Sequence, residues 1–279
     1  MTKKLLAVAV AALGLTACAS QSKEKGAEET EAQKVLVLYY SQTGATKTVA
    51  EEIQKQTGAD IEALEVENPY DGDFQQTIER CQKEKAAGEL PTLKPIKANL
   101  DEYDVVFLGF PVWFGTYAPP VEALLKEVDF DGKKVVSFCT FGSGGLQTST
   151  NDLKAALPKA EVVEGYGVRN ARLGAVGKEI ARFLIEGGYI DGEVEPLADF
   201  SAPAEVTEED INRFNEACGD YQFPLGTPVT VGSRATADGM EYIYTAKSQG
   251  PDGSESTSTI YVVQDSTAGA KAEFTQVVR

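Results

Sequence analysis

Hydroxyl-bearing residues around a glycine follow the first apolar stretch of the chain, and they could bind a phosphate group. The apolar stretch covers residues 34–40, and it is followed by Ser41, Gln42, Thr43, Gly44, Ala45 and Thr46. The next residues, through position 57, have an amphipathic pattern that predicts a helix. The N-terminus of a helix offers unpaired backbone N–H groups, and the hydroxyls add donors. This arrangement suits a phosphate monoester and needs no cationic side chain.

The loop at residues 41–46 differs from two common nucleotide-binding patterns. It lacks the lysine of a Walker loop and the spaced glycines of a dinucleotide-binding fingerprint. The pattern therefore favours a mononucleotide over ATP or NAD. Ser, Thr and Gly at a strand-to-helix turn are also ordinary helix-capping residues, so the loop alone leaves a purely structural role open.

Two further loops combine aromatic residues and glycines where an apolar strand ends. The second loop, residues 109–119, contains Pro111, Val112, Phe114 and the only tryptophan of the chain, Trp113. A rigid aromatic surface could stack against a flat heteroaromatic ring, although the same residues could instead cap the sheet core. The third loop contains Thr140, Phe141, Gly142, Ser143 and Gly144. Its glycines would let backbone N–H groups approach a ligand closely.

The segments that position these loops alternate between strand-like and helix-like patterns from residue 34 to residue 188. We expect strands at residues 35–40, 60–65, 105–110, 134–140 and 160–165, and helices at 45–57, 74–87, 120–127, 146–156 and 171–186. This alternation predicts an α/β fold with a doubly wound, five-stranded parallel sheet that helices cover on both faces. Ligands of such sheets bind outside the carboxyl ends of the strands, so the three loops are expected to form one site.

Taken together, the three loops resemble those of flavodoxins. Residues 41–46 are similar to the flavodoxin FMN phosphate loop, Ser/Thr-x-Thr-Gly-x-Thr. Longer flavodoxin-like proteins carry Gly-x-Pro-x-Trp-Trp in the second loop and a Phe-Cys-Thr strand end before the third. Residues 109–114 and 138–140 match these patterns, except that Phe114 stands in place of the second tryptophan. The third loop also lacks the tyrosine that often covers the outer face of the flavin.

The resemblance covers residues 34–188 and implies the flavodoxin sheet order 2-1-3-4-5 and bound FMN as the cofactor. Residues 41–46 would hold the phosphate, residues 111–114 would meet the ring, and residues 140–144 would bind its polar edge. The segment Thr43–Thr46 is also similar to the acceptor motif of proteins that carry FMN esterified to threonine. A noncovalent phosphate loop explains the same residues.

The composition excludes several kinds of catalysis and partner. The chain has no histidine, which excludes a His-based triad, an imidazole base or a His metal site. No carboxylate or cysteine cluster has metal-ligand spacing, so we expect no metal site and no catalytic side chain, and any redox chemistry would come from a cofactor. The formal net charge of −17 makes nucleic acid a poor partner. We expect Cys139 to be buried, and we leave Cys81 and Cys218 as free thiols.

The first residues have the pattern of an export signal. Lys3 and Lys4 precede an apolar run at residues 5–15, and Leu15-Thr16-Ala17-Cys18 follows. This pattern resembles bacterial lipoproteins, in which the cysteine becomes the lipidated N-terminus. It predicts a signal peptide at residues 1–17, a polar tether at 18–33, and a lipid-anchored, extracytoplasmic protein of the bacterial cell envelope. Membrane contact would occur through the lipid on Cys18 only.

The C-terminal part of the chain has a different pattern. Residues 189–222 are expected to form an acidic linker with one short helix. Residues 223–279 are expected to form a small antiparallel β meander, with strands at 227–234, 241–247, 256–263 and 272–278 separated by turn signals. A meander of this size needs a covered face, so we expect it to pack on the flavodoxin-like domain or on the helix at 207–218.

These features favour electron transfer through FMN at the cell envelope, with a redox partner protein or a small molecule as the electron acceptor. An apolar aromatic site with acidic surroundings disfavours added negative charge on the ring and predicts a low reduction potential. One alternative is a flavin-dependent quinone or NAD(P)H oxidoreductase. The other is a lipid-anchored binding module without enzymatic activity.

Overall fold

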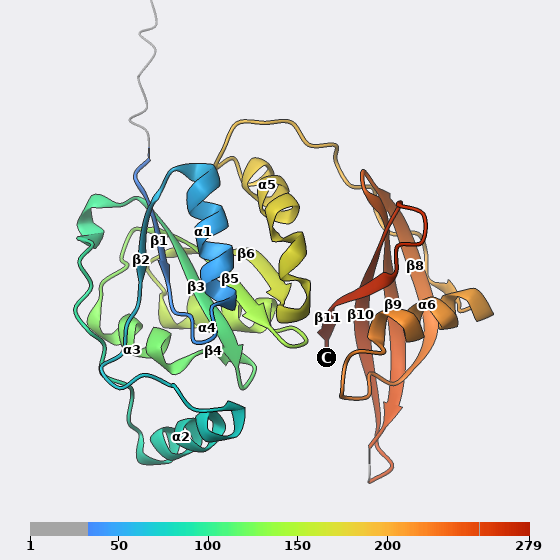
Figure 1. The fold of residues 1–279 in the computed structure, drawn as a ribbon, viewed down its shortest axis with the longest axis horizontal. Coiled ribbons are helices and arrows are strands. Elements are labelled where there is room, and N and C mark those ends of the chain that lie inside the picture. Colours follow the sequence, from blue (N-terminus) through green and yellow to red (C-terminus); the bar gives the residue numbers. More distant parts are fainter. Residues whose placement is uncertain (1–32, 251) are drawn as a thin grey trace, which may run out of the picture. The chain divides into compact units, whose positions relative to one another are not determined.

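A parallel sheet forms the centre of the region that precedes residue 189. The computed structural model describes residues 33–250 and 252–279. The parallel strands are β1 (Val35–Tyr39), β2 (Asp60–Ala63), β3 (Val105–Trp113), β5 (Lys134–Phe141) and β6 (Glu161–Arg169), in the order β2-β1-β3-β5-β6 (Figure 1). Neighbouring strands along this order all pair in parallel. The doubly wound sheet and its 2-1-3-4-5 order are therefore confirmed.

Helices cover both faces of this sheet because alternate strand residues point to opposite sides. On one face, α1 (Ala45–Thr57) and α5 (Val176–Glu186) share an apolar cluster with Val37 and Phe107. On the other face, α2 (Phe74–Ala87), α3 (Pro119–Glu127) and α4 (Leu146–Ala156) contribute to a cluster with Leu38 and Leu108. The first six residues of β3 are buried, as expected for a central strand of a parallel sheet.

Two elements differ from the sequence prediction in ways that affect the site. Strand β3 does not end at residue 110 but continues to Trp113 and pairs in antiparallel fashion with the short strand β4 (Thr116–Tyr117). The second loop is thus a hairpin and not an irregular segment. The helix predicted at 171–186 is divided into a 3₁₀ segment, η2 (Asn170–Ala175), and α5, and Arg172 within η2 has non-helical backbone angles. A second 3₁₀ segment, η1 (Leu100–Glu102), precedes β3.

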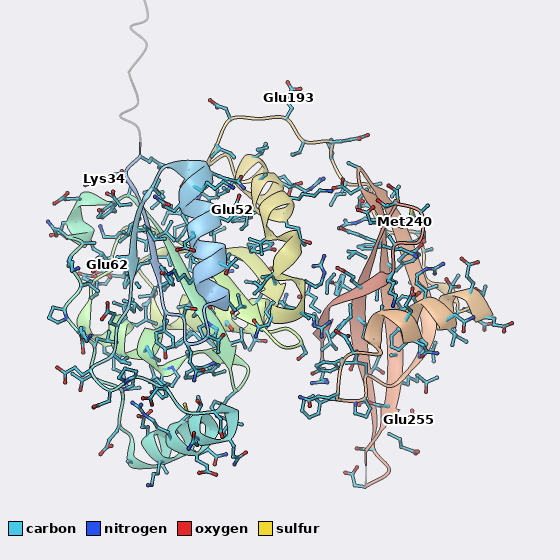
Figure 2. All side chains as sticks on the ribbon, viewed as in Figure 1. Lys34, Glu52, Glu62, Glu193, Met240 and Glu255 are labelled. Carbon is cyan, nitrogen blue, oxygen red and sulfur yellow. The ribbon has the colours of Figure 1, made fainter. Side chains whose placement is uncertain are left out.

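The C-terminal region forms a separate antiparallel sheet. Its strands are β7 (Ala204–Glu205), β8 (Thr227–Thr236), β9 (Gly239–Gln249), β10 (Glu255–Asp265) and β11 (Ala272–Val278), in the order β11-β10-β9-β8-β7. The predicted antiparallel meander is confirmed. Strand β7 is an addition, since it lies within the segment that the sequence predicts to be a linker. Figure 2 labels Glu193 on the irregular segment between α5 and β7.

Helix α6 (Glu208–Cys218) covers one face of this sheet. Its residues Phe214 and Ala217 are buried in an apolar cluster with Tyr244, Ile260 and Phe274. The helix begins at a capping box in which Thr207 and Asp210 exchange hydrogen bonds. The sheet therefore has its own core, and the expected packing on the 207–218 helix is confirmed.

The thiols in the described region fit the sequence analysis. Cys81, Cys139 and Cys218 are free, and Cys139 is fully buried within β5. No helix among the described residues combines the length and apolar character needed to cross a bilayer. The predicted signal peptide and the predicted lipidation site at Cys18 lie outside the described residues.

Candidate functional site

The first loop presents the open N-terminus of α1. Strand β1 ends at Tyr39, and Gly44 occupies the N-cap position with a left-handed φ of 93°. Because glycine has no side chain, no capping side chain occupies the N-terminus of α1. Ser41 Oγ accepts a hydrogen bond from the Lys47 N–H at 3.2 Å. A Cβ atom added to Gly44 would meet nothing within 4 Å, so open space lies in front of the helix N-terminus. This is the geometry that a bound anion requires.

Hydrogen bonds hold the first loop on two sides. Thr46 Oγ1 and Thr140 Oγ1 lie 2.9 Å apart and are both buried, which joins the first loop to the third. The side-chain amide of Gln42 donates to Tyr70 O at 2.9 Å and to Thr77 Oγ1 at 2.8 Å. Gln42 and Thr46 thus brace the loop, while Thr43 is exposed at its tip.

The cations near the first loop already have partners. Lys47 Nζ lies 3.6 Å from Glu51 Oε1 on the exposed side of α1. Arg80 Nε donates to Glu84 at 2.7 Å, and its guanidinium stacks 3.8 Å from the centroid of the Tyr70 ring. Backbone N–H groups and hydroxyls are therefore the donors that this loop offers to an anion, in agreement with its sequence.

The two adjacent aromatic side chains of the second loop, Trp113 and Phe114, have different surroundings. Trp113 is half-buried and makes edge-to-face contacts with Tyr40 and Tyr70, at centroid distances of 5.9 and 5.2 Å. Phe114, at the tip of the hairpin, is 60% exposed. Its φ of 53° is the only positive φ of a non-glycine residue in the described part of the chain. The hairpin turn holds this exposed aromatic residue in a strained conformation, which makes Phe114 a candidate ligand-binding residue.

The tyrosines behind Trp113 remain neutral. Burial raises the pKa of Tyr40 above the usual range for a phenol. The pKa of Tyr70 is raised first by burial and then by the hydrogen bond that its hydroxyl donates to Glu84. The two phenol rings therefore form a neutral wall, and the Arg80–Glu84 ion pair against Tyr70 has no net charge.

The third loop connects β5 to α4 and packs on the second loop. A Cβ atom on Gly145 would lie 2.7 Å from Val112 Cγ1, so the Val112 side chain packs directly on the backbone of Gly145. Phe141 is only 3% exposed and belongs to the core, whereas Gly142 is exposed. Phe141 can therefore offer a ligand only its backbone groups, and the same holds for the buried Ala45 in the first loop.

The structure thus brings the three predicted loops together at one edge of the sheet. Tyr70, Thr77 and Arg80 were not predicted as site residues, although the stretch from Asn68 to Arg80 also resembles flavodoxin-like sequences. Arg169 was not predicted either, because its contact with the third loop has no local sequence signal. Among the described residues, no group of His, Cys, Asp and Glu could hold a metal ion.

Phe114 gives a test that separates ligand binding from folding. Type I′ hairpin turns require positive φ at both central residues and favour Asn-Gly, and Phe114 and Gly115 have φ values of 53° and 85°. Phe114→Asn should therefore raise the free energy of unfolding by about 0.5–1 kcal/mol, since asparagine tolerates this conformation. It should lower the affinity for FMN about fivefold, because one aromatic contact is lost. Chemical denaturation and fluorescence titration measure the two effects. A variant that loses stability and binds FMN normally would contradict a ligand-binding role.

The flavodoxin family model matches residues 34–179, which is more than half of the chain. The chain belongs to the flavodoxin family. This membership supports FMN as the cofactor of the flavodoxin domain, as the sequence predicts. The comparison with curated proteins gave no match.

Solved structures of flavoproteins align with the flavodoxin domain. A protein from Bacteroides eggerthii that is assigned as a flavoprotein has 28% identity, with 54% of this chain and 99% of that chain covered and a TM-score of 0.45. A flavoprotein from Lactobacillus acidophilus in complex with FMN has 24% identity, with 55% and 99% covered and a TM-score of 0.45. Oxidised flavodoxin 2 from Bacillus cereus has 19% identity, with 55% and 99% covered and a TM-score of 0.35.

Proposed function

We propose that this chain binds FMN noncovalently where the three loops meet and transfers electrons to a redox partner. The observation that carries the proposal is the open N-terminus of α1, held beside the third loop by the pair Thr46–Thr140. A phosphate fits the first-turn N–H groups and the exposed Thr43 hydroxyl. Space for it exists because Gly44 has no side chain.

The aromatic residues of the second loop would hold the ring. Trp113 is fixed by Tyr40 and Tyr70, so it offers a preorganised surface, while Phe114 is free to lie against a flat ligand. Both side chains would exclude water from the ring. The backbone N–H groups of the third loop would donate to its polar edge, where Gly142 leaves open space.

Bound FMN would supply the capacity to accept and release one or two electrons. The residues around FMN determine its reduction potential. The neutral tyrosine wall and the net charge of −17 both disfavour added negative charge on the ring. We therefore propose a low reduction potential, which suits a donor of electrons.

The place of this function is the bacterial cell envelope. The proposal is supported by the sequence of residues 1–18, with its basic start, short apolar run and Leu15-Thr16-Ala17-Cys18. A lipid on Cys18 would keep the protein at a membrane surface that its acidic exterior would otherwise avoid. The redox partner would then be another protein or a small electron acceptor at the same surface.

A reductase assay distinguishes an electron carrier from an oxidoreductase. Protein lacking residues 1–17 is loaded with FMN and mixed with NADH or NADPH and a soluble quinone. We expect the bound flavin to be reduced by dithionite and reoxidised by the quinone, with NADH consumed no faster than by free FMN. Rapid consumption of NADH would instead identify an oxidoreductase. A preparation without flavin absorbance after FMN addition would leave only the binding-module alternative.

A further inference from the structure

The third loop is in contact with the last strand of the C-terminal sheet. The Val277 N–H, on β11, donates to Ser143 O at 2.7 Å. A Cβ atom on Gly144 would lie 2.5 Å from Val277 O, so the two backbones lie against each other at this point. Only glycine at position 144 permits this approach. The contact joins a proposed flavin loop to a residue more than 130 positions away in the sequence.

Arg169 makes a second connection between the same two segments. It is the last residue of β6 and is only 5% exposed. Its Nε donates to Gly142 O at 2.9 Å, and its Nη1 donates to Phe274 O, on β11, at 3.0 Å. The guanidinium also lies 4.3 Å from the centroid of the Phe274 ring. One planar side chain therefore holds a carbonyl of the loop and a carbonyl of β11 at a fixed separation.

Because Arg169 is buried, its guanidinium needs hydrogen-bond acceptors in both segments. Burial lowers the pKa of Arg169, and the carboxylate of Asp220 opposes this effect from 3.8 Å. Burying a cation destabilises the folded protein unless the N–H groups of the cation have acceptors. Gly142 O and Phe274 O are the two acceptors bonded to the guanidinium, so displacement of either segment would leave one N–H group of this buried cation without an acceptor.

The two connections both act on carbonyl oxygens of the loop. With Gly142 O and Ser143 O held by donors from outside, the loop presents its N–H groups to a ligand. These N–H groups are the ones that the proposed function assigns to the polar edge of the ring. An ion pair between the largely buried Arg172 and the exposed Glu273, at 2.9 Å, adds a further contact between η2 and β11.

We propose that β11 is a positioning element for the flavin loop, acting through Val277 N–H and Arg169, so that the C-terminal sheet sets flavin affinity and reduction potential. The inference rests on the proposed function, because it assigns a role toward the same FMN site. It gives the C-terminal sheet, which lies beyond residues 34–179, a role in the chemistry of the flavodoxin domain. A loosened loop would hold its N–H donors less precisely against the ring.

The test compares two substitutions at Val277 in protein lacking residues 1–17. Proline removes the N–H that bonds to Ser143. Since β11 is an edge strand and this N–H bonds to the loop, the pairing of β11 with β10 should persist. Alanine keeps the N–H but removes the apolar side chain, which is buried in the core of the C-terminal sheet. Alanine thus controls for packing and stability.

Hydrogen exchange of the flavin-free protein gives a readout that does not depend on FMN. We expect amides at residues 141–145 to exchange at least tenfold faster in Val277→Pro than in Val277→Ala. With FMN, the dissociation constant of Val277→Pro should rise about fivefold and its reduction potential should become more negative, because fewer donors face the charge that reduction adds. Val277→Ala should match the wild type in both.

A second variant covers the case in which Val277→Pro does not fold. Arg169→Lys keeps the positive charge but cannot bridge two carbonyls with a planar fork, so it should show the same three changes. If the wild type binds FMN and both variants match Val277→Ala in exchange and binding, the inference is wrong and the proposed function stands. If the wild type fails to bind FMN, the proposed function is wrong and this inference falls with it.

Discussion

Gly44→Ala is expected to lower the affinity for FMN at least tenfold while leaving the affinity for riboflavin unchanged. The methyl group would enter the open space in front of α1, where the phosphate is proposed to lie. Each hydrogen bond to a charged group contributes about 1.5–3 kcal/mol, so the loss of one such bond accounts for a change of about tenfold or more. Riboflavin has no phosphate and would not be affected. Fluorescence titration with both flavins measures the effect.

Gly58→Ala is a matched control for backbone strain. Gly58 follows the other end of α1 and has a φ of 69°, against 93° for Gly44, and neither glycine has an atom within 4 Å of an added Cβ. Alanine in this conformation costs about 1–2 kcal/mol at either position. Both variants should therefore lose similar stability, and only Gly44→Ala should lose FMN affinity. Equal losses of affinity would mean that strain in α1, and not a phosphate contact, explains the result.

Cys18→Ser is expected to abolish lipid attachment and release the protein from the membrane fraction. Cys18 follows a short apolar run and small residues, and it is the only cysteine in this segment. A thioether to a lipid requires the sulfur atom, so serine cannot replace it. Metabolic labelling with a fatty acid, followed by fractionation of cells, measures both effects. Wild-type protein should carry the label and sediment with membranes.

Cys218→Ser controls for the removal of a thiol elsewhere in the chain. Cys218 is a free, half-buried thiol at the end of α6, and burial raises its pKa to about 12, so it is poorly reactive. This variant should remain labelled and membrane-bound. An unlabelled wild type in the cytosol would contradict both the lipoprotein hypothesis and a function at the cell envelope.

The parts of the fold that sequence predicts best are those with local signals. The bounds of α1, α2 and α4 agree with the predicted helices, because each is preceded by a glycine or a capping residue and carries an apolar stripe. The strand order follows from the flavodoxin resemblance and is confirmed. The first loop is also local, since strand, glycine and helix are consecutive. The sequence therefore predicts the open geometry of this loop.

The parts of the structure that the sequence did not predict depend on contacts between residues far apart in the chain. Strand β3 continues past Pro111 because β4 folds back on it, and the sequence shows only an aromatic run. Strand β7 has two residues and exists through pairing with β8. The bond from Arg169 to Phe274 O spans 105 positions. Such pairings are decided by tertiary packing, so propensity and periodicity cannot reveal them.

The sequence also did not predict the different exposure of Trp113 and Phe114. Both residues stand in one apolar run, and the sequence gives no reason to bury one and expose the other. Their difference follows from the hairpin, which turns at Phe114 and directs Trp113 against Tyr40 and Tyr70. The sequence therefore predicted an aromatic surface but not which side chain is free to meet a ligand.

The comparison of FMN with riboflavin in wild-type protein tests the central claim most directly. Protein lacking residues 1–17 is titrated with each flavin by calorimetry. We expect FMN to bind near one-to-one and about 100-fold more tightly than riboflavin, because two or more charge-assisted hydrogen bonds to the phosphate would be absent. The flavin should be released on denaturation. Equal affinity for the two flavins would contradict the phosphate site at residues 41–46, and no binding of either would contradict the proposed function.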